Sequence, residues 1–242
     1  MAAASKPTCK QLMAQLKKLG KESHRKTFIR HGAPEDRIFG VPVADLKPIQ
    51  KKIKQDYELS LELFETGNSD AQYLAGLIGD GSRMRRSDLN KWARDAAWSM
   101  ISTYAVGGVA AESPHALALG TKWIDSKQEK IAMTGWDTLS GYLSITPDDE
   151  VELKLVEGLL NRVVKEIHGE RNEVKHSMNR FVIAVGSYVV PLKAKALKAA
   201  GKIGKVEVDH GDTSCKTPLA KEYIEKVAKQ GRTGKKRKFA RC

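Results

Sequence analysis

The sequence predicts an all-α protein whose short amphipathic helices stack in pairs into a curved solenoid. Apolar residues recur at the helical period of 3.6 in nearly every segment between turn residues. Strand-like alternation is nearly absent, and its one candidate, residues 205–211 (KVEVDHG), is interpreted as a loop. Helix pairs recur roughly every 35 to 45 residues, which is the spacing of HEAT-type repeats. We therefore expect a HEAT-like superhelix of about six helix pairs with a concave surface.

The first third of the chain contains several helix boundaries. Thr8 and Gln11 have the spacing of a capping box, which predicts a helix start at the N-terminus. A second, basic helix over residues 21–31 should end at the break Gly32-Ala33-Pro34. The apolar spacing predicts further helices at residues 43–53, 57–65 and 70–78.

Residues 83–104 (RMRRSDLNKWARDAAWSMISTY) begin with three arginines, Arg83, Arg85 and Arg86. The rest of the segment is predicted to form one helix with Ser87 as its N-cap. Its apolar stripe contains Leu89, Trp92, Ala93, Ala96, Ala97, Met100, Ile101 and Tyr104. Trp98 falls on the opposite side, together with Lys91, Arg94 and Ser102. Cations bind phosphates and an aromatic face stacks on a base, so this side is interpreted as a nucleic-acid surface. The alternative is that a second layer covers Trp98 as ordinary core.

The second half of the chain continues the helical pattern. Ser113 as N-cap with Pro114 at the first helical position predicts a helix start. Trp92, Trp123 and Trp136 all fall on apolar stripes and are expected in the core. Further helices are predicted at residues 151–167, along the stripe of residues 174–185, and after Thr217-Pro218, and residues 192–200 are lysine-rich.

The chain is strongly basic. Its 242 residues carry 42 Lys and Arg against 29 Asp and Glu, for a net charge of +13. Residues 231–242 hold six Lys or Arg and no acid, so residues 1–230 keep 13 − 6 = +7. Such a chain should attract polyanions, above all nucleic acid. We expect residues 1–230 to form a single domain and residues 231–242 a disordered basic tail.

Other classes of protein are disfavoured. No apolar run approaches the roughly 20 residues of a membrane span, and the N-terminus lacks a signal-peptide core. Three scattered cysteines imply no disulfide framework, so a reducing compartment is expected: cytoplasmic and nucleoid-associated, or nuclear, and not secreted. Residues 208–215 (VDHGDTSC) lack a recognised ligand spacing and favour a structured loop, with metal binding or a Cys–His pair as alternatives. No cofactor or metal is expected.

Several blocks resemble the AlkD-like DNA alkylation repair proteins. They are residues 38–43 (IFGVPV) with Leu46, residues 61–65 (LELFE) followed by Ala71, Leu74 and Ala75, and residues 122–124 (KWI). Their order and spacing fit across roughly residues 10 to 200. The resemblance implies a HEAT-like solenoid whose basic concave face cradles duplex DNA. Active members of the family release alkylated purines with an aspartate, aromatic side chains and an arginine beside the lesion.

Carried over to this sequence, the family's catalytic site is incomplete. The family's W-x-x-x-D element aligns with Trp98 to Ser102, so serine stands at the aspartate position. The family's arginine falls at or near Met133, and its second tryptophan near Arg180. A serine hydroxyl carries no charge to stabilise the sugar cation that forms as a base leaves. The resemblance therefore supports the fold and DNA binding more than it supports catalysis.

Three functions remain open. The first is a DNA-binding protein that lacks the family's catalytic aspartate and binds double-stranded DNA as a monomer. The second is an active alkylpurine DNA glycosylase with a rearranged site, for instance one that uses Asp95. The third is a helical-repeat scaffold for acidic protein partners. Catalytic residues cannot be assigned; the predicted DNA-binding residues are Arg83, Arg85, Arg86, Lys91, Arg94, Trp98, Ser102, Lys175 and Arg180.

Overall fold

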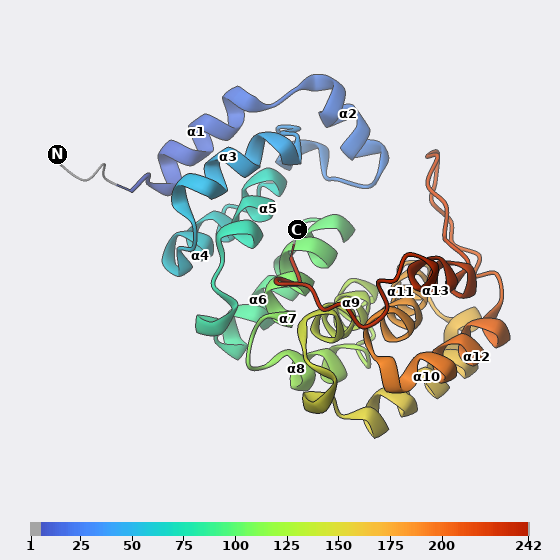
Figure 1. The fold of residues 1–242 in the computed structure, drawn as a ribbon. Helices are drawn as coiled ribbons and strands as arrows, with labels where there is room; N and C mark the ends of the chain where they lie inside the picture. Colours follow the sequence, from blue (N-terminus) through green and yellow to red (C-terminus); the bar gives the residue numbers. More distant parts are fainter. Residues whose placement is uncertain (1–5, 242) are drawn as a thin grey trace.

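The computed structural model describes residues 6–241, and all regular secondary structure within them is helical, with no strand (Figure 1). This confirms the all-α prediction. Seven helices form the first half of the chain: α1 (Cys9–Leu19), α2 (Glu22–Arg30), α3 (Val43–Ile53), α4 (Tyr57–Glu65), α5 (Ser69–Ile78), α6 (Arg86–Asp95) and α7 (Gly108–Ala111). Six follow: α8 (Ala116–Trp123), α9 (Glu129–Ile145), α10 (Leu153–Glu166), α11 (Asn172–Tyr188), α12 (Lys193–Ile203) and α13 (Ala220–Lys229).

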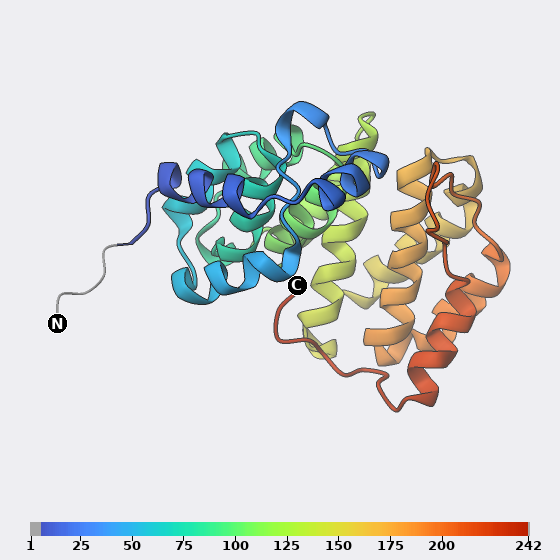
Figure 2. The same cartoon turned by 90° about the horizontal axis from the view of Figure 1, so that it is seen from above.

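The helices bury two hydrophobic clusters, one in each half of the chain. The first cluster extends from Leu12 to Trp123 and the second from Ile124 to Ile224. Figure 2 shows the two halves side by side, with α9 at the junction, where it packs against α8 and α11. Trp92, Trp123 and Trp136 are buried in these clusters, as the apolar stripes predict. Helix α9 thus connects the two halves through its packing against α8 and α11.

Residues 83–104 do not form the single helix predicted from the stripe. Helix α6 ends at Asp95, and the chain continues as a π-helix over Ile101–Gly107. The break is stabilised from outside this segment. The Lys130 ammonium donates hydrogen bonds of 2.7 Å to two carbonyls that the helix end leaves unpaired, those of Arg94 and Ala96. The buried Gln72 amide contacts the break twice more, donating to the Asp95 carbonyl and accepting from the Ala97 N–H.

The break changes which side chains of this segment are buried. Leu89 and Trp92 lie in the core as predicted. Trp98, predicted on the side opposite the apolar stripe, is only 7% exposed, whereas Tyr104, predicted on the stripe, is 42% exposed.

The start of α6 also differs from the prediction. Its N-cap is Arg85, whose N–H donates to the Asp88 carboxylate at 3.1 Å, and Ser87 lies inside the helix.

The C-terminal residues are ordered and packed, which corrects the prediction of a disordered tail. Residues 231–241, hereafter the strap, run from the end of α13 across α9 toward α7 (Figures 1 and 2). Backbone hydrogen bonds attach it to α11 and α9, from Gly234 N–H to the Ser187 carbonyl and from Arg237 N–H to the Ser144 carbonyl. At its end Arg241 is buried, because Glu112 in the first half of the chain pairs with its guanidinium at 3.2 Å.

Among the described residues, no helix combines the length and the apolar composition that crossing a membrane would require.

Candidate functional site

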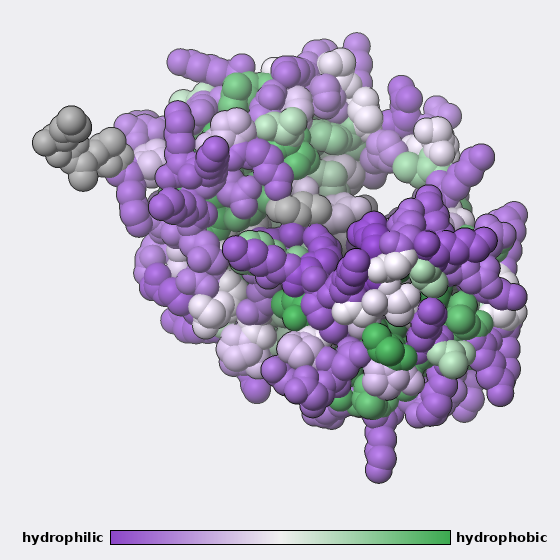
Figure 3. Space-filling model, viewed as in Figure 1, coloured by the Kyte–Doolittle hydropathy of each residue, from purple (hydrophilic) through white to green (hydrophobic). Residues whose placement is uncertain are grey.

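A cleft between the two halves of the molecule contains two adjoining cavities. The upper cavity, of about 580 Å³, lies between α2, residues 98–104, α11 and residues 208–211. The second cavity, hereafter the cavity beneath the strap, has a volume of about 720 Å³ and lies between α9, α11, α13 and the strap. Four residues line both cavities: Thr103, Tyr104, His176 and Arg180. The space-filling view is indented between α2 and the C-terminal side (Figure 3), so the upper cavity opens at the surface.

Three positions that the family resemblance singles out lie around the upper cavity. Trp98, Met133 and Arg180 come from three different segments, and all line it. Trp98 packs against Phe28 of α2, with ring centroids 6.0 Å apart, so it belongs to the core as well as to the cavity wall. Its indole N–H has no hydrogen-bond partner among the described residues. The prediction that Trp98 lies away from the core is therefore wrong, although the residue does border the cleft.

Ser102 is fully buried, and its hydroxyl makes no hydrogen bond to any described residue. Its predicted contact with DNA is incompatible with this position, because the π-helix turns Ser102 inward and Tyr104 outward. Ser102, which aligns with the family's catalytic aspartate, therefore has no side-chain atom in the wall of either cavity.

Asp137 is an acidic residue of the cleft that no local sequence pattern predicts. It lies one helical turn after Met133 in α9, and its side chain is 2% exposed. Its carboxylate accepts hydrogen bonds from Thr103 at 2.6 Å and Ser177 at 3.2 Å, and it pairs with Arg180 at 3.4 Å. One feature of the sequence nevertheless indicates such a site. Asp137 directly follows Trp136 on an apolar helix, and a buried carboxylate needs hydrogen-bond or charged partners from elsewhere in the fold.

A cluster of titratable groups borders the upper cavity. Burial, followed by the nearby Arg180 guanidinium, lowers the pKa of His176 below its usual 6.5, against the opposing effect of Asp137. The His210 ring, on the loop after α12, stands edge-on to the His176 ring at 5.6 Å and also lowers its pKa. Burial and the neighbouring Glu129 raise the pKa of Glu173.

This cluster leads to a prediction about stability. Because the pKa of His176 is lower in the folded chain, the unfolded chain binds the proton more readily. The stabilisation from a neutral His176 is present above pH 6.5 and is lost as the pH falls through the folded pKa. We therefore expect His176→Gln to flatten the decline in the free energy of unfolding between about pH 7 and pH 5, measured by urea denaturation. The exposed His24 provides a control as His24→Gln, and an unchanged slope in His176→Gln would contradict this assignment.

The predicted basic residues of α6 and its approach lie elsewhere. Arg83 pairs with Glu58 at 2.6 Å, Arg85 with Asp88 at 3.0 Å, and Lys91 with Asp95 at 2.8 Å. Arg86 donates to His115, and Arg94 is exposed. None of these residues lines either cavity, and neither does Asp95. The structure therefore separates them from Arg180 and from Lys175, which sits beside the cavity-lining His176 on α11.

The loop of residues 208–215 is held against α11. Asn172 pairs with the backbone of Asp209 twice, each time at 2.7 Å, and His210 contacts the Thr217 hydroxyl at 3.0 Å. Within the described residues, no three metal-ligating side chains gather at one place. These contacts are those of a structured loop.

Comparison with known proteins agrees with this architecture. Residues 12–205 match the model of the family described as DNA alkylation repair enzyme. The chain belongs to this family. Its membership and its helical fold confirm the resemblance found in residues 38–75 and 122–124.

Relatives of this DNA alkylation repair family member cover nearly the whole chain. A solved structure described as "a new family of proteins related to the HEAT-like repeat DNA glycosylases with affinity for branched DNA structures" is 37% identical. It superposes with a TM-score of 0.89 over 98% of this chain and 100% of that chain. The uncharacterized proteins Lin0241 of Listeria innocua and Lmo0209 of Listeria monocytogenes are 34% and 33% identical over 225 residues. Each match covers 91% of this chain and 97% of the relative.

Proposed function

We propose that this protein binds DNA in the cleft between its two halves and does not excise alkylated purines by the family's mechanism. The charge around the cavity beneath the strap is the observation that carries the proposal. Arg180, Lys226, Arg232, Lys235, Lys236 and Arg237 line this cavity, and Asp137 is the sole carboxylate among the described residues there. Phosphate groups are the ligands that such an excess of cations attracts.

The fold supports the same ligand. The family is one of DNA repair proteins, and the structural relative has affinity for branched DNA. Branched as well as linear duplexes are therefore the ligands to test. The peptide-scaffold alternative also uses a concave basic surface, but its acidic partners would not give the salt dependence of phosphate contacts.

The carboxylates near the cleft do not fit the family's mechanism of excision. A carboxylate must face the departing sugar to stabilise its positive charge. Ser102 cannot supply this charge and is buried, while Asp95 lies outside both cavities. Asp137 lines the cavity beneath the strap, but its carboxylate already binds Thr103, Ser177 and Arg180. A glycosylase with a rearranged site would have to use one of the three acids that line the cavities, Asp137, Glu173 or Asp209.

The binding prediction compares two triple variants with the same loss of charge. Arg30→Gln/Lys226→Gln/Lys235→Gln removes three cations that line the two cavities, and we expect it to weaken binding to a duplex and to a four-way junction. The slope of log affinity against log salt should become shallower by roughly 2 to 3, since each lost phosphate contact removes roughly 0.9. Fluorescence anisotropy at several salt concentrations measures both quantities.

The control triple variant is Arg83→Gln/Arg86→Gln/Arg94→Gln, whose residues were predicted DNA contacts but lie outside the cavities. It should change the salt slope less than the cleft variant. If the control has the larger effect, the DNA surface lies on α6 and the cleft proposal is wrong.

Wild-type protein incubated with methylated DNA should release no N3- or N7-alkylpurine. Release that is abolished in Asp137→Asn would instead show that the protein is an active glycosylase.

A further inference from the structure

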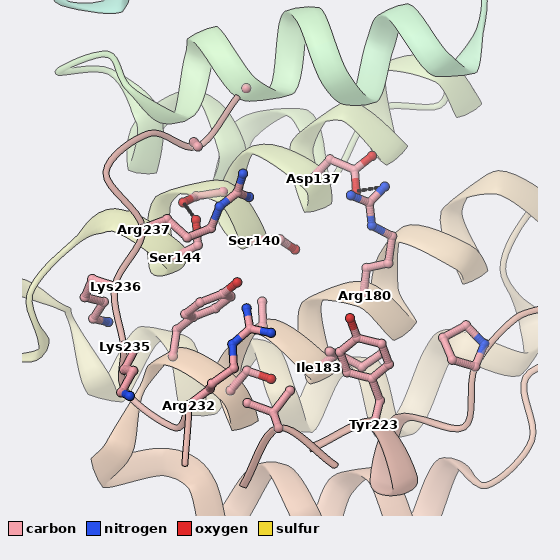
Figure 4. A pocket seen from close by; sticks show the side chains of 18 of the residues that line it. Asp137, Ser140, Ser144, Arg180, Ile183, Tyr223, Arg232, Lys235, Lys236 and Arg237 are labelled. Atoms are coloured by element: carbon pink, nitrogen blue, oxygen red, sulfur yellow. Dashed lines mark hydrogen bonds and ion pairs between the residues drawn. The ribbon is translucent and has the colours of Figure 1, made fainter. Parts of the chain in front are cut away.

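The cavity beneath the strap differs from an open groove because the strap forms part of its wall. The strap crosses it between α13 and α9 and contributes Arg232, Lys235, Lys236 and Arg237 to its wall. Figure 4 shows the guanidinium groups of Arg180, Arg232 and Arg237 around one open space, with Ser140 and Tyr223 facing the same space. At about 720 Å³, it has the size of a small-molecule site rather than of a surface crevice.

Several of these cations have no acidic partner. Asp137 pairs with Arg180, and Asp148 pairs with Lys236 at 2.8 Å. Within residues 6–241, no ion pair involves the other four cations of the wall, Lys226, Arg232, Lys235 and Arg237. This charge excess favours a ligand with at least one phosphate.

Aromatic rings accompany the charge. Tyr104 and Tyr223 line the cavity, and they are 42% and 45% exposed, although rings of this size are usually more deeply buried. The Arg180 guanidinium lies 5.6 Å from the centre of the Tyr104 ring, which orients that ring at the junction of the two cavities. Exposed aromatic faces beside arginines are the arrangement on which unpaired bases stack.

We propose that the cavity beneath the strap binds an unpaired nucleotide of a nucleic-acid strand. The phosphate contacts Arg232 and Arg237, and the base stacks on Tyr223. A base inside an intact duplex is covered by its neighbours above and below, so it cannot present its face to Tyr223. The site therefore selects a splayed nucleotide or a strand end. This inference rests on the proposed DNA binding for the source of the strand, but the site itself can be tested with short oligonucleotides.

The test uses fluorescence anisotropy with a labelled six-nucleotide oligothymidylate and the full-length protein. Wild-type protein should bind this probe, and Tyr223→Ala should weaken binding at least tenfold, whereas Tyr223→Phe keeps the ring and should retain the affinity. Arg232→Gln should also weaken binding by at least fivefold. Lys238→Gln, on the strap but outside the cavity wall, removes the same charge and should have less than a twofold effect. A probe of equal length without bases should bind more weakly than the oligothymidylate.

The outcomes separate this inference from the proposed function. If Tyr223→Ala leaves oligothymidylate binding unchanged while the cleft variant still weakens duplex binding, the nucleotide site is wrong and the DNA proposal stands. If the probe without bases binds as well as oligothymidylate, the cavity holds phosphate only and the base contact is wrong. Binding of oligothymidylate without any duplex or junction binding would support the nucleotide site and overturn the proposed function.

Discussion

Replacing Trp98 with alanine is expected to lower the free energy of unfolding by about 3 to 5 kcal/mol, the range for removal of a buried aromatic ring. Trp98 is 7% exposed and packs on Phe28, so it fills the contact between α2 and the start of the π-helix. Its loss leaves a cavity that the neighbouring helices cannot close without moving. Any loss of DNA affinity in this variant would therefore come partly from a displaced α2.

Urea denaturation followed by circular dichroism measures this effect. Tyr104→Ala is the matched control, because Tyr104 lies six residues further along but is 42% exposed, and it should cost less than about 1 kcal/mol. The opposite result, a stable Trp98→Ala protein with greatly reduced DNA affinity, would show that Trp98 acts mainly as a DNA contact.

Replacing Arg241 with alanine should release the strap and cost about 3 kcal/mol, because it breaks a buried ion pair. The Arg241 and Glu112 side chains are 6% and 12% exposed, and the guanidinium also donates to the Gly79 carbonyl. Without Arg241, the Glu112 carboxylate loses its charged partner. The cost lies at the lower end of the range for such pairs, since water can reach Glu112 once the strap has left.

Limited digestion with trypsin detects the released strap, because cleavage after Lys235, Lys236, Arg237 or Lys238 requires the strap backbone to leave its hydrogen bonds with α9 and α11. Cleavage should be much faster in Arg241→Ala than in the wild type. Glu112→Gln should have the same effect while it leaves the sequence of the strap unchanged. Lys238→Gln keeps the Arg241–Glu112 pair and should digest at the wild-type rate apart from the lost site. Equal digestion of all four proteins would mean that this pair does not hold the strap.

The sequence predicts the fold well because each helix carries its own signal. The capping box at Thr8, with Gln11 at its third position, forms as expected, and its hydrogen bonds lie within four residues of the chain. The three core tryptophans follow from the helical period alone. Such features depend on neighbours in sequence, which any single chain displays directly.

The features that the sequence did not predict depend on distant residues. Helix α6 ends at Asp95 because Lys130 and Gln72 bind the carbonyls there. The strap is ordered because Glu112 holds Arg241, 129 residues further along the chain. Composition alone suggested disorder, since a run of cations without acids has no local partner. The Asp137 site is likewise assembled from three segments that no local pattern connects.

The π-helix also bears on how members of the family diverge. A π-turn holds one residue more than an α-turn, so one inserted residue is enough to create it from an α-helix. Deleting one residue within Ile101–Gly107 would restore the α-helical register and rotate the preceding side chains by roughly 100° relative to those that follow. Gain or loss of a cleft-facing group can thus follow from an insertion or deletion as well as from a substitution. Comparison of aligned residue types alone would miss such a change.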